Sequence, residues 1–285
     1  MIAVLVSCGR IWTLALRHIY LLRGSWPRVL ELVYWPAVQI VLWGFISVFL
    51  RGQSSFVAHA FGVLLAGVML WDLMFRGQLG VSISFFEEMW SRNLGNLFVS
   101  PLRPWEMIAA LLTMSVVRTL IAMVPASILA ILFFHFSIYS LGWPLLAFFV
   151  NLLVFGWAIG LAVSGLVMRV GLGAEGFAWA AIFAIAPVSA VYYPVSILPD
   201  WLQAIAWILP PAYVFEGMRA AILEHRFRSD LLLCAMALNV VYFGAGSLAF
   251  LLFFRSARIT GKLLQIGEYS VIPNHRGTEI VESSC

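Results

Sequence analysis

The sequence predicts an all-α integral membrane protein with six membrane-spanning helices. Of its 285 residues, 63% are hydrophobic and only 11% are Asp, Glu, Lys or Arg, whereas a soluble domain carries about 25% charged residues. A soluble fold of this length could not bury so much apolar surface, but a lipid bilayer solvates it. Apolar segments of about 20 residues recur along the chain, and a segment of that length can cross a bilayer as a helix.

Six of these segments are predicted to span the membrane, and two of them carry a charge inside the span. Asp72 lies in the second and can pair with Arg76 on the same helix face, near the cytoplasmic boundary. Arg118 lies deep in the third, where it needs a partner or an aqueous path, so a structural ion pair and a position on a translocation path are both open. The predicted spans are 32–50, 55–75, 107–134, 143–168, 176–198 and 231–254, and the second is expected to continue as a helix to 86.

The distribution of basic residues orients the chain. With the N-terminus placed inside, twelve of the 17 Lys and Arg residues fall in the inner connections and termini, and four fall outside. Inner loops of membrane proteins are enriched in Lys and Arg, so both termini are predicted to be cytoplasmic. The net charge of +4 does not indicate nucleic-acid binding, because the basic residues form no continuous patch.

The two ends of the chain differ from the spans. Ile11, Leu14, Ala15, Ile19 and Leu22 recur at helical spacing, and Arg10 and Arg17 share another face. This pattern predicts an amphipathic helix that lies in the membrane interface. The segment after Arg258 is polar and without apolar periodicity. We therefore expect one transmembrane domain, 1–258, and a short cytoplasmic tail, 259–285.

Prolines concentrate before the last span. The apolar stretch 201–215 is too short to cross and contains Pro210-Pro211, and each proline removes a backbone donor. Irregular backbone at membrane depth requires protein or water around it. We interpret 199–216 as a re-entrant hairpin on the outer side, with a loop on the membrane surface as the alternative. The prolines assigned to this region are Pro194, Pro199, Pro210 and Pro211.

Motifs for catalysis and nucleotide binding are missing from the sequence. No GxxxxGK[ST] loop occurs, so we expect no ATP hydrolysis by this chain. The letters GxGxxG at 171–176 fall between two spans, without the strand that a dinucleotide fold requires. Histidines and cysteines are scattered, so no metal or other cofactor is expected. Gly156, Gly160 and Ser164 form a small-residue face for close packing of another helix, within this chain or in a dimer.

The connection after the second span resembles that of the ABC-2 type transporter permeases. That family carries there an acidic residue, then Arg, Gly, an apolar pair and Ser-Pro, and the chain reads FEEMWSRNLGNLFVSPL over 86–102. Residues 193–213, with Tyr193-Pro194 and Leu209-Pro-Pro, are similar to the family's segment before its last span. The matching residues of the first segment are Glu87, Glu88, Arg92, Leu94, Gly95, Leu97, Phe98, Ser100 and Pro101.

The resemblance implies a multi-pass protein of the bacterial inner membrane that exports an amphipathic drug, lipid-linked or glycan-type substrate. It implies two separate ATPase subunits, which carry ATP and Mg, and a second permease copy, making a homodimer. Residues 87–100 would form the coupling helix that rests on the ATPase, beside the amphipathic helix of Arg10 and Arg17. Two other functions stay open: a membrane enzyme that modifies lipids and an ion-coupled transporter, for which Asp72 is the one carboxylate well inside a span.

Overall fold

The computed structural model describes residues 2–51 and 55–260, apart from the side chains of 2–5, 50–51, 55–61, 98, 172 and 260, and the description of the fold refers to these parts. Helices dominate them, and no strand occurs in the described ranges. Five helices are long and apolar enough to cross a membrane. These are α2 (Trp26–Arg51), α3 (Ser55–Trp90), α5 (Pro104–Phe134), α6 (Trp143–Val170) and α10 (Ser229–Thr260).

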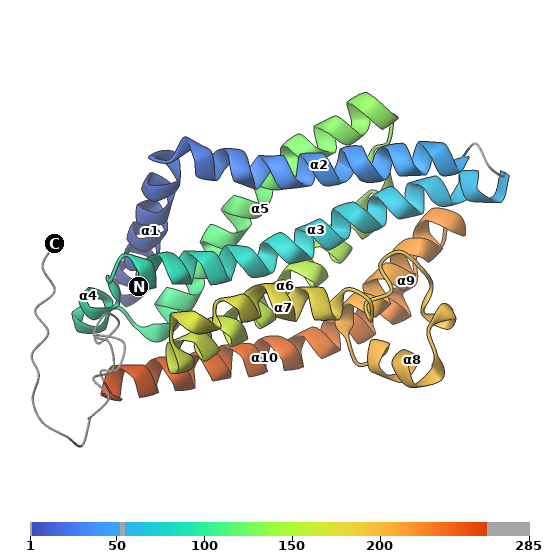
Figure 1. Ribbon diagram of the computed structural model, residues 1–285. Coiled ribbons are helices and arrows are strands. Elements are labelled where there is room, and N and C mark those ends of the chain that lie inside the picture. The colour runs from blue at the N-terminus through green and yellow to red at the C-terminus, as the bar shows by residue number, and fades with distance from the viewer. Residues whose placement is uncertain (1, 52–54, 261–285) are drawn as a thin grey trace, which may run out of the picture.

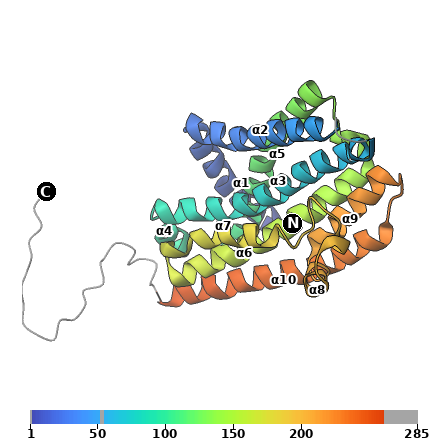
Figure 2. The same ribbon diagram turned by 45° about the vertical axis from the view of Figure 1, so that its right-hand side comes forward.

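The long helices run side by side, and shorter elements lie at the two ends of the bundle (Figures 1 and 2). Helix α1 (Ile2–Arg23) crosses one end at a steep angle to α2, and the short α4 (Leu94–Val99) lies at the same end. Helices α8 (Asp200–Ala206) and α9 (Pro210–Leu223) lie toward the opposite end. Short 3-10 helices occur at Ile138–Leu141, Leu172–Ala174 and Val195–Ile197. We refer below to the α4 end and the α8 end.

The predicted fifth span, 176–198, does not form one helix. Helix α7 (Gly176–Ile185) has 10 residues and is about 15 Å long, which is half the thickness of a hydrocarbon core. Turns follow it from 186, because Pro187 and Pro194 lack the N–H that a continuing helix needs. The described residues therefore contain five helices that are long and apolar enough to cross a membrane, and the count of six spans stays a prediction.

The predicted hairpin contains two short helices. Pro199 precedes α8, and Pro210 and Pro211 occupy the first turn of α9, where a missing N–H costs no helical hydrogen bond. Arg219 of α9 donates to the carbonyl oxygens of residues 190 and 191, at 2.6 and 3.3 Å. These contacts fix the turn after α7 to α9, but whether the hairpin is re-entrant stays a prediction.

Helix α3 is the centre of the bundle, with 78% of its most apolar window buried, against 22% for α2 and α10. Glycines bring α6 against it: a Cβ on Gly156 would lie 2.6 Å from the carbonyl oxygen of Met74, and one on Gly160 would lie 2.8 Å from that of Gln78. The small-residue face of α6 thus packs within the chain. On the α5 side, Gly80 approaches Ser115, whose hydroxyl donates to the Gly77 carbonyl at 2.7 Å.

The outer helices expose large apolar side chains in stripes, as a surface solvated by lipid requires. The largest exposed fractions on α2 and α10 include those of Phe45, Phe49, Val240, Val241 and Leu252. Polar side chains collect instead at the α4 end and along one face of α3. The predicted tail, 259–285, lies outside the described residues except for 259 and 260, which continue α10.

Candidate functional site

Two carboxylates are buried near the end of α3. Glu87 and Glu88 are 7% and 1% exposed, and burial of a carboxylate is costly unless it is paired. For Glu87, Arg118 of α5 donates at 2.7 Å and Arg28 of α2 at 3.2 Å. The Nδ1 atom of His18 lies 3.5 Å from the same carboxylate. Glu87 therefore joins three helices to α3.

Glu88 is paired as fully as its neighbour. Arg17 of α1 donates to both of its oxygens, at 2.6 and 2.9 Å, and the Asn93 side chain donates at 2.7 Å. The Nε2 atom of His18 lies 3.3 Å from Glu88, so this buried imidazole sits between the two carboxylates. We call Arg17, His18, Arg28, Glu87, Glu88, Asn93 and Arg118 the Glu87–Glu88 network.

Helix α1 is anchored on its basic face. Arg10 donates to the carbonyl oxygen of Pro101 at 2.9 Å, and Ser7 donates to Glu106 of α5 at 2.6 Å. Arg10 and Arg17 do share a face, as predicted, and this face contacts the ends of α3 and α5. The placement of α1 in the membrane interface stays a prediction.

The predicted coupling segment, 87–100, is not one helix. Glu87 and Glu88 belong to the buried end of α3, which continues to Trp90. Arg92 then adopts a left-handed backbone with φ of 52°, a conformation that ends a helix. Only Leu94–Val99 form the separate helix α4, which ends at Ser100 in extended backbone, as a residue before proline prefers.

The residues of α4 divide into an inner and an outer set. Leu94 is buried at 3% exposure, so it holds α4 to the bundle and is not available to a partner. Val99 is 89% exposed, and Arg92, Asn96 and Pro101 are exposed beside it. Gly95, Leu97 and Ser100 are intermediate. The side chain of Phe98, a predicted anchor for the ATPase, lies outside the described residues.

The surroundings of Arg118 agree in part with a structural ion pair and in part with a position on a translocation path. It is 5% exposed and paired with Glu87, as the structural interpretation requires. Side chains in a helix point toward its N-terminus, so Arg118 reaches from within α5 toward the α4 end. It also lines a cavity, while its Nε has no hydrogen-bond partner. A role of Arg118 in transport stays a prediction.

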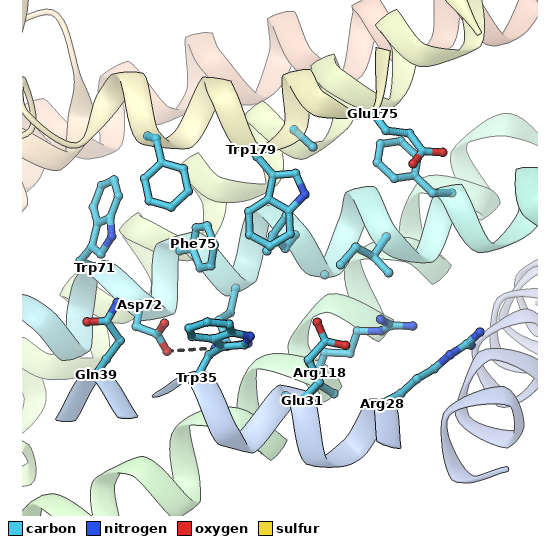
Figure 3. Close-up of a pocket in the computed structure, with 18 of the residues that line it drawn as sticks. Arg28, Glu31, Trp35, Gln39, Trp71, Asp72, Phe75, Arg118, Glu175 and Trp179 are labelled. Carbon is cyan, nitrogen blue, oxygen red and sulfur yellow. Dashed lines mark hydrogen bonds and ion pairs between the residues drawn. The ribbon is translucent and has the colours of Figure 1, made fainter. Parts of the chain in front are cut away.

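That cavity has a volume of about 660 Å³ and lies between α2, α3 and α7 (Figure 3). Its volume is typical of sites for drug-sized ligands. Aromatic side chains form most of the apolar lining: Trp35, Trp71, Phe75, Phe86, Trp90, Trp179, Phe183 and Tyr192. The charged lining residues are Arg28, Glu31, Asp72, Arg76, Glu87, Arg118 and Glu175. Across the described residues, no group of three His, Cys, Asp or Glu could hold a metal ion.

Asp72 and Arg76 form the predicted pair, with 3.1 Å between Arg76 Nε and the carboxylate. The pair lies near the middle of α3 (Ser55–Trp90), and its position near the cytoplasmic boundary of the membrane stays a prediction. Both residues line the cavity. A charged pair is costly in lipid, and Asp72 and Arg76 are buried within the chain, so protein and the cavity rather than lipid lie against them.

Four residues of the cavity walls were not among the site residues predicted from the sequence. Glu31 and Trp35 on α2, and Glu175 and Trp179 at the start of α7, each stand four residues apart. That spacing puts each pair on one helix face. The four-residue spacing is visible in the sequence. The position of the two pairs on opposite sides of one cavity is not, because it depends on how α2 and α7 pack beside α3.

A bundle of long apolar helices with paired charges in its interior and an aromatic cavity along one face defines a multi-pass membrane protein. The family model described as ABC-2 type transporter matches residues 11–223, most of the chain. The chain belongs to the ABC-2 type transporter family and is the permease component of an ABC transporter. No individual curated protein matches the sequence.

Proposed function

We propose that this chain is the permease of a bacterial inner-membrane ABC exporter for an amphipathic substrate. ATP hydrolysis takes place on separate subunits, which carry the ATP and Mg, and this chain holds no cofactor. Two permease copies, as a homodimer, work with two ATPases. The family membership supports the class of function, and the connection of α4 to the bundle is the observation that carries the mechanism.

The α4 end is suited to receive a motion from outside the membrane. Helix α4 exposes Val99, and Arg92 is exposed just before the helix, while Leu94 holds α4 to the bundle. It is flanked by the fully paired end of α3 and by the Arg10 contact to Pro101. A rigid-body displacement of α4 would therefore be passed to α1, α3 and α5 together, since tightly packed elements move as units.

The cavity supports a translocation path on the face of α3 between α2 and α7. Asp72 and Arg76 line it near the middle of α3, and Arg118 lines it nearer the α4 end. Asp72 and Arg76 are only 8% and 7% exposed within the single chain, and a second permease copy facing the open side of the cavity would complete a path between the copies.

The orientation follows from the basic residues of the sequence. Arg92 and Arg103 flank α4, and Arg10, Arg17 and Arg23 are on α1. Their gathering at the α4 end supports a cytoplasmic position for this end and for both termini. Labelling of single cysteines at positions 96 and 200 from either side of the membrane tests it. Labelling of position 200 from the cytoplasm alone would overturn the orientation.

Co-purification tests the ATPase partner. We expect an affinity-tagged chain, expressed with its native gene neighbourhood, to retain a nucleotide-hydrolysing protein of domain size. The purified chain alone is expected to show no ATP turnover. ATPase activity in a homogeneous preparation of this chain would refute the proposal that ATP is hydrolysed on separate subunits. A tagged chain that never retains an ATPase would refute the proposed assembly.

A further inference from the structure

The two walls of the cavity carry matching pairs of an acid and a tryptophan. On α2, Trp35 follows Glu31 by four residues, and at the start of α7 Trp179 follows Glu175 by four. Figure 3 shows the two pairs on opposite sides of the cavity, with Phe75 of α3 between the tryptophans. Each wall thus offers one carboxylate and one indole to the same space.

The carboxylates of these pairs differ from the other charges of the cavity. Each arginine of the lining is already paired with a carboxylate: Arg28 and Arg118 with Glu87, and Arg76 with Asp72. Glu31 and Glu175 make no ion pair with a described residue, although Glu175 accepts a hydrogen bond from Trp90 at 2.6 Å. The lining holds three arginines and four carboxylates, so its formal charge is 3 − 4 = −1.

The position of the carboxylates suits the capture of a cation. Glu31 lies in the second turn of α2, and Glu175 directly precedes α7, so both lie toward the α4 end of the cavity. Farther from that end, the tryptophans offer indole faces, which attract cations more strongly than other aromatic rings. A positive group between Glu31 and Glu175 would have its apolar substituents among Trp35, Phe75 and Trp179.

We propose that this cavity binds an amphipathic organic cation, with its charge held by Glu31 and Glu175 and its apolar body held by the aromatic walls. The role of that cation as transport substrate rests on the proposed function, but its binding does not. An anion is the competing ligand, because buried N–H groups of Arg76 and Arg118 lack acceptors. The existing carboxylate partners of both arginines favour the cation.

Two ions of the same shape and opposite charge separate these ligands. The purified full-length chain in lipid nanodiscs is titrated with radiolabelled tetraphenylphosphonium and with tetraphenylborate, and binding to empty nanodiscs is subtracted. We expect saturable binding of the phosphonium at least about tenfold tighter than that of the borate. Equal affinity, or tighter binding of the borate, would overturn the proposal.

Single substitutions then locate the site. Glu31→Gln and Glu175→Gln should each weaken phosphonium binding at least about threefold, and Trp179→Ala should weaken it while Trp179→Phe restores most of it. Glu224→Gln removes an exposed carboxylate near the α8 end and should leave the affinity unchanged. Unchanged affinity in both Glu31→Gln and Glu175→Gln would refute the assignment. Glu31 is exposed, so its amide variant folds even if a variant at Trp179 does not.

The outcome is independent of the proposed function. Phosphonium binding in nanodiscs needs no ATPase, so its loss would reject the cation site while co-purification of an ATPase could still succeed. Conversely, saturable binding that depends on Glu31 and Glu175, in a chain that never retains an ATPase, would uphold the site and reject the assembly.

Discussion

The acidic residues at the end of α3 and those on the cavity walls are of the same chemical type in opposite surroundings. Glu87 and Glu88 are buried, and arginine, histidine and asparagine side chains surround them. Glu31 and Glu175 border open space and have no cationic partner among the described residues. A saturated carboxylate holds helices together, whereas an unsaturated one beside a cavity is available to a ligand. We therefore expect Glu87 and Glu88 to contribute to the stability of the fold, and Glu31 and Glu175 to contribute to ligand binding.

The largest effect is expected from Glu88→Ala. This change leaves Arg17 without its carboxylate, while His18 keeps Glu87 at 3.5 Å. Breaking a fully buried pair by removing one partner costs about 3–5 kcal/mol, and the partial exposure of Arg17 places this change at the lower end of that range. We expect the free energy of unfolding of the purified chain to fall by about that amount, measured by denaturation in detergent micelles. Glu31→Gln is the control and should change it by less than about 0.5 kcal/mol. A similar loss of unfolding free energy in the two variants would contradict the distinction between paired and unpaired carboxylates.

The next effect comes from the packing of α3. A Cβ at residue 156 would meet the backbone of α3, which cannot rotate away as a side chain can. Gly156→Ala should therefore destabilise the chain by about 1–3 kcal/mol. Gly173→Ala is the matched control, because a Cβ there meets nothing within 4 Å. Thermal unfolding of both variants in the same detergent measures the difference, and equal midpoints would contradict the close contact.

A smaller loss of stability is expected from Arg118→Ala. Glu87 keeps Arg28 and His18 when Arg118 is removed, so the free energy of unfolding should fall by about 1–2 kcal/mol. Transport in membrane vesicles should fall as well if Arg118 lines the path. A stable, assembled variant with reduced transport would favour the path, whereas loss of assembly would favour the structural pair. Normal assembly with normal transport would exclude both roles.

The smallest effect on stability is expected from substitutions in the predicted coupling segment, 87–100. Phe98→Ala should reduce recovery of the ATPase more than Arg92→Ala, because apolar anchors carry most interface energy and rim charges mainly tune association. Neither variant should alter membrane abundance, to which the recovery is normalised. Leu94→Ala serves as the contrast, since this buried residue should affect stability first. Recovery of the ATPase at the wild-type level in both the Phe98 and the Arg92 variants would show that the predicted coupling segment does not contact the ATPase.

The sequence predicted the membrane class, the family and the long helices well, since about 20 apolar residues in a row leave a chain few alternatives. It also predicted the pair of Asp72 and Arg76, which depends only on helical spacing. The break after Ile185 was missed, because uncharged composition masked the effect of Pro187. The burial of Glu87 and Glu88 was missed for another reason. Their partners Arg17, Arg28 and Arg118 come from three other helices, and no local pattern reveals that convergence.

The glycine contacts of α3 limit the motions open to the bundle. Gly80 meets α5, Gly156 and Gly160 of α6 meet α3, and Gly246 of α10 meets Ala158 of α6. Because the helices are closely packed at these contacts, we expect α3, α5, α6 and α10 to move together as one rigid frame. Helix α7 is short, and a Cβ added at Gly173, before the helix, or at Gly176, its first residue, would meet nothing within 4 Å. We therefore expect changes in the width of the cavity to come from α7, through the segment 171–176, rather than from that frame.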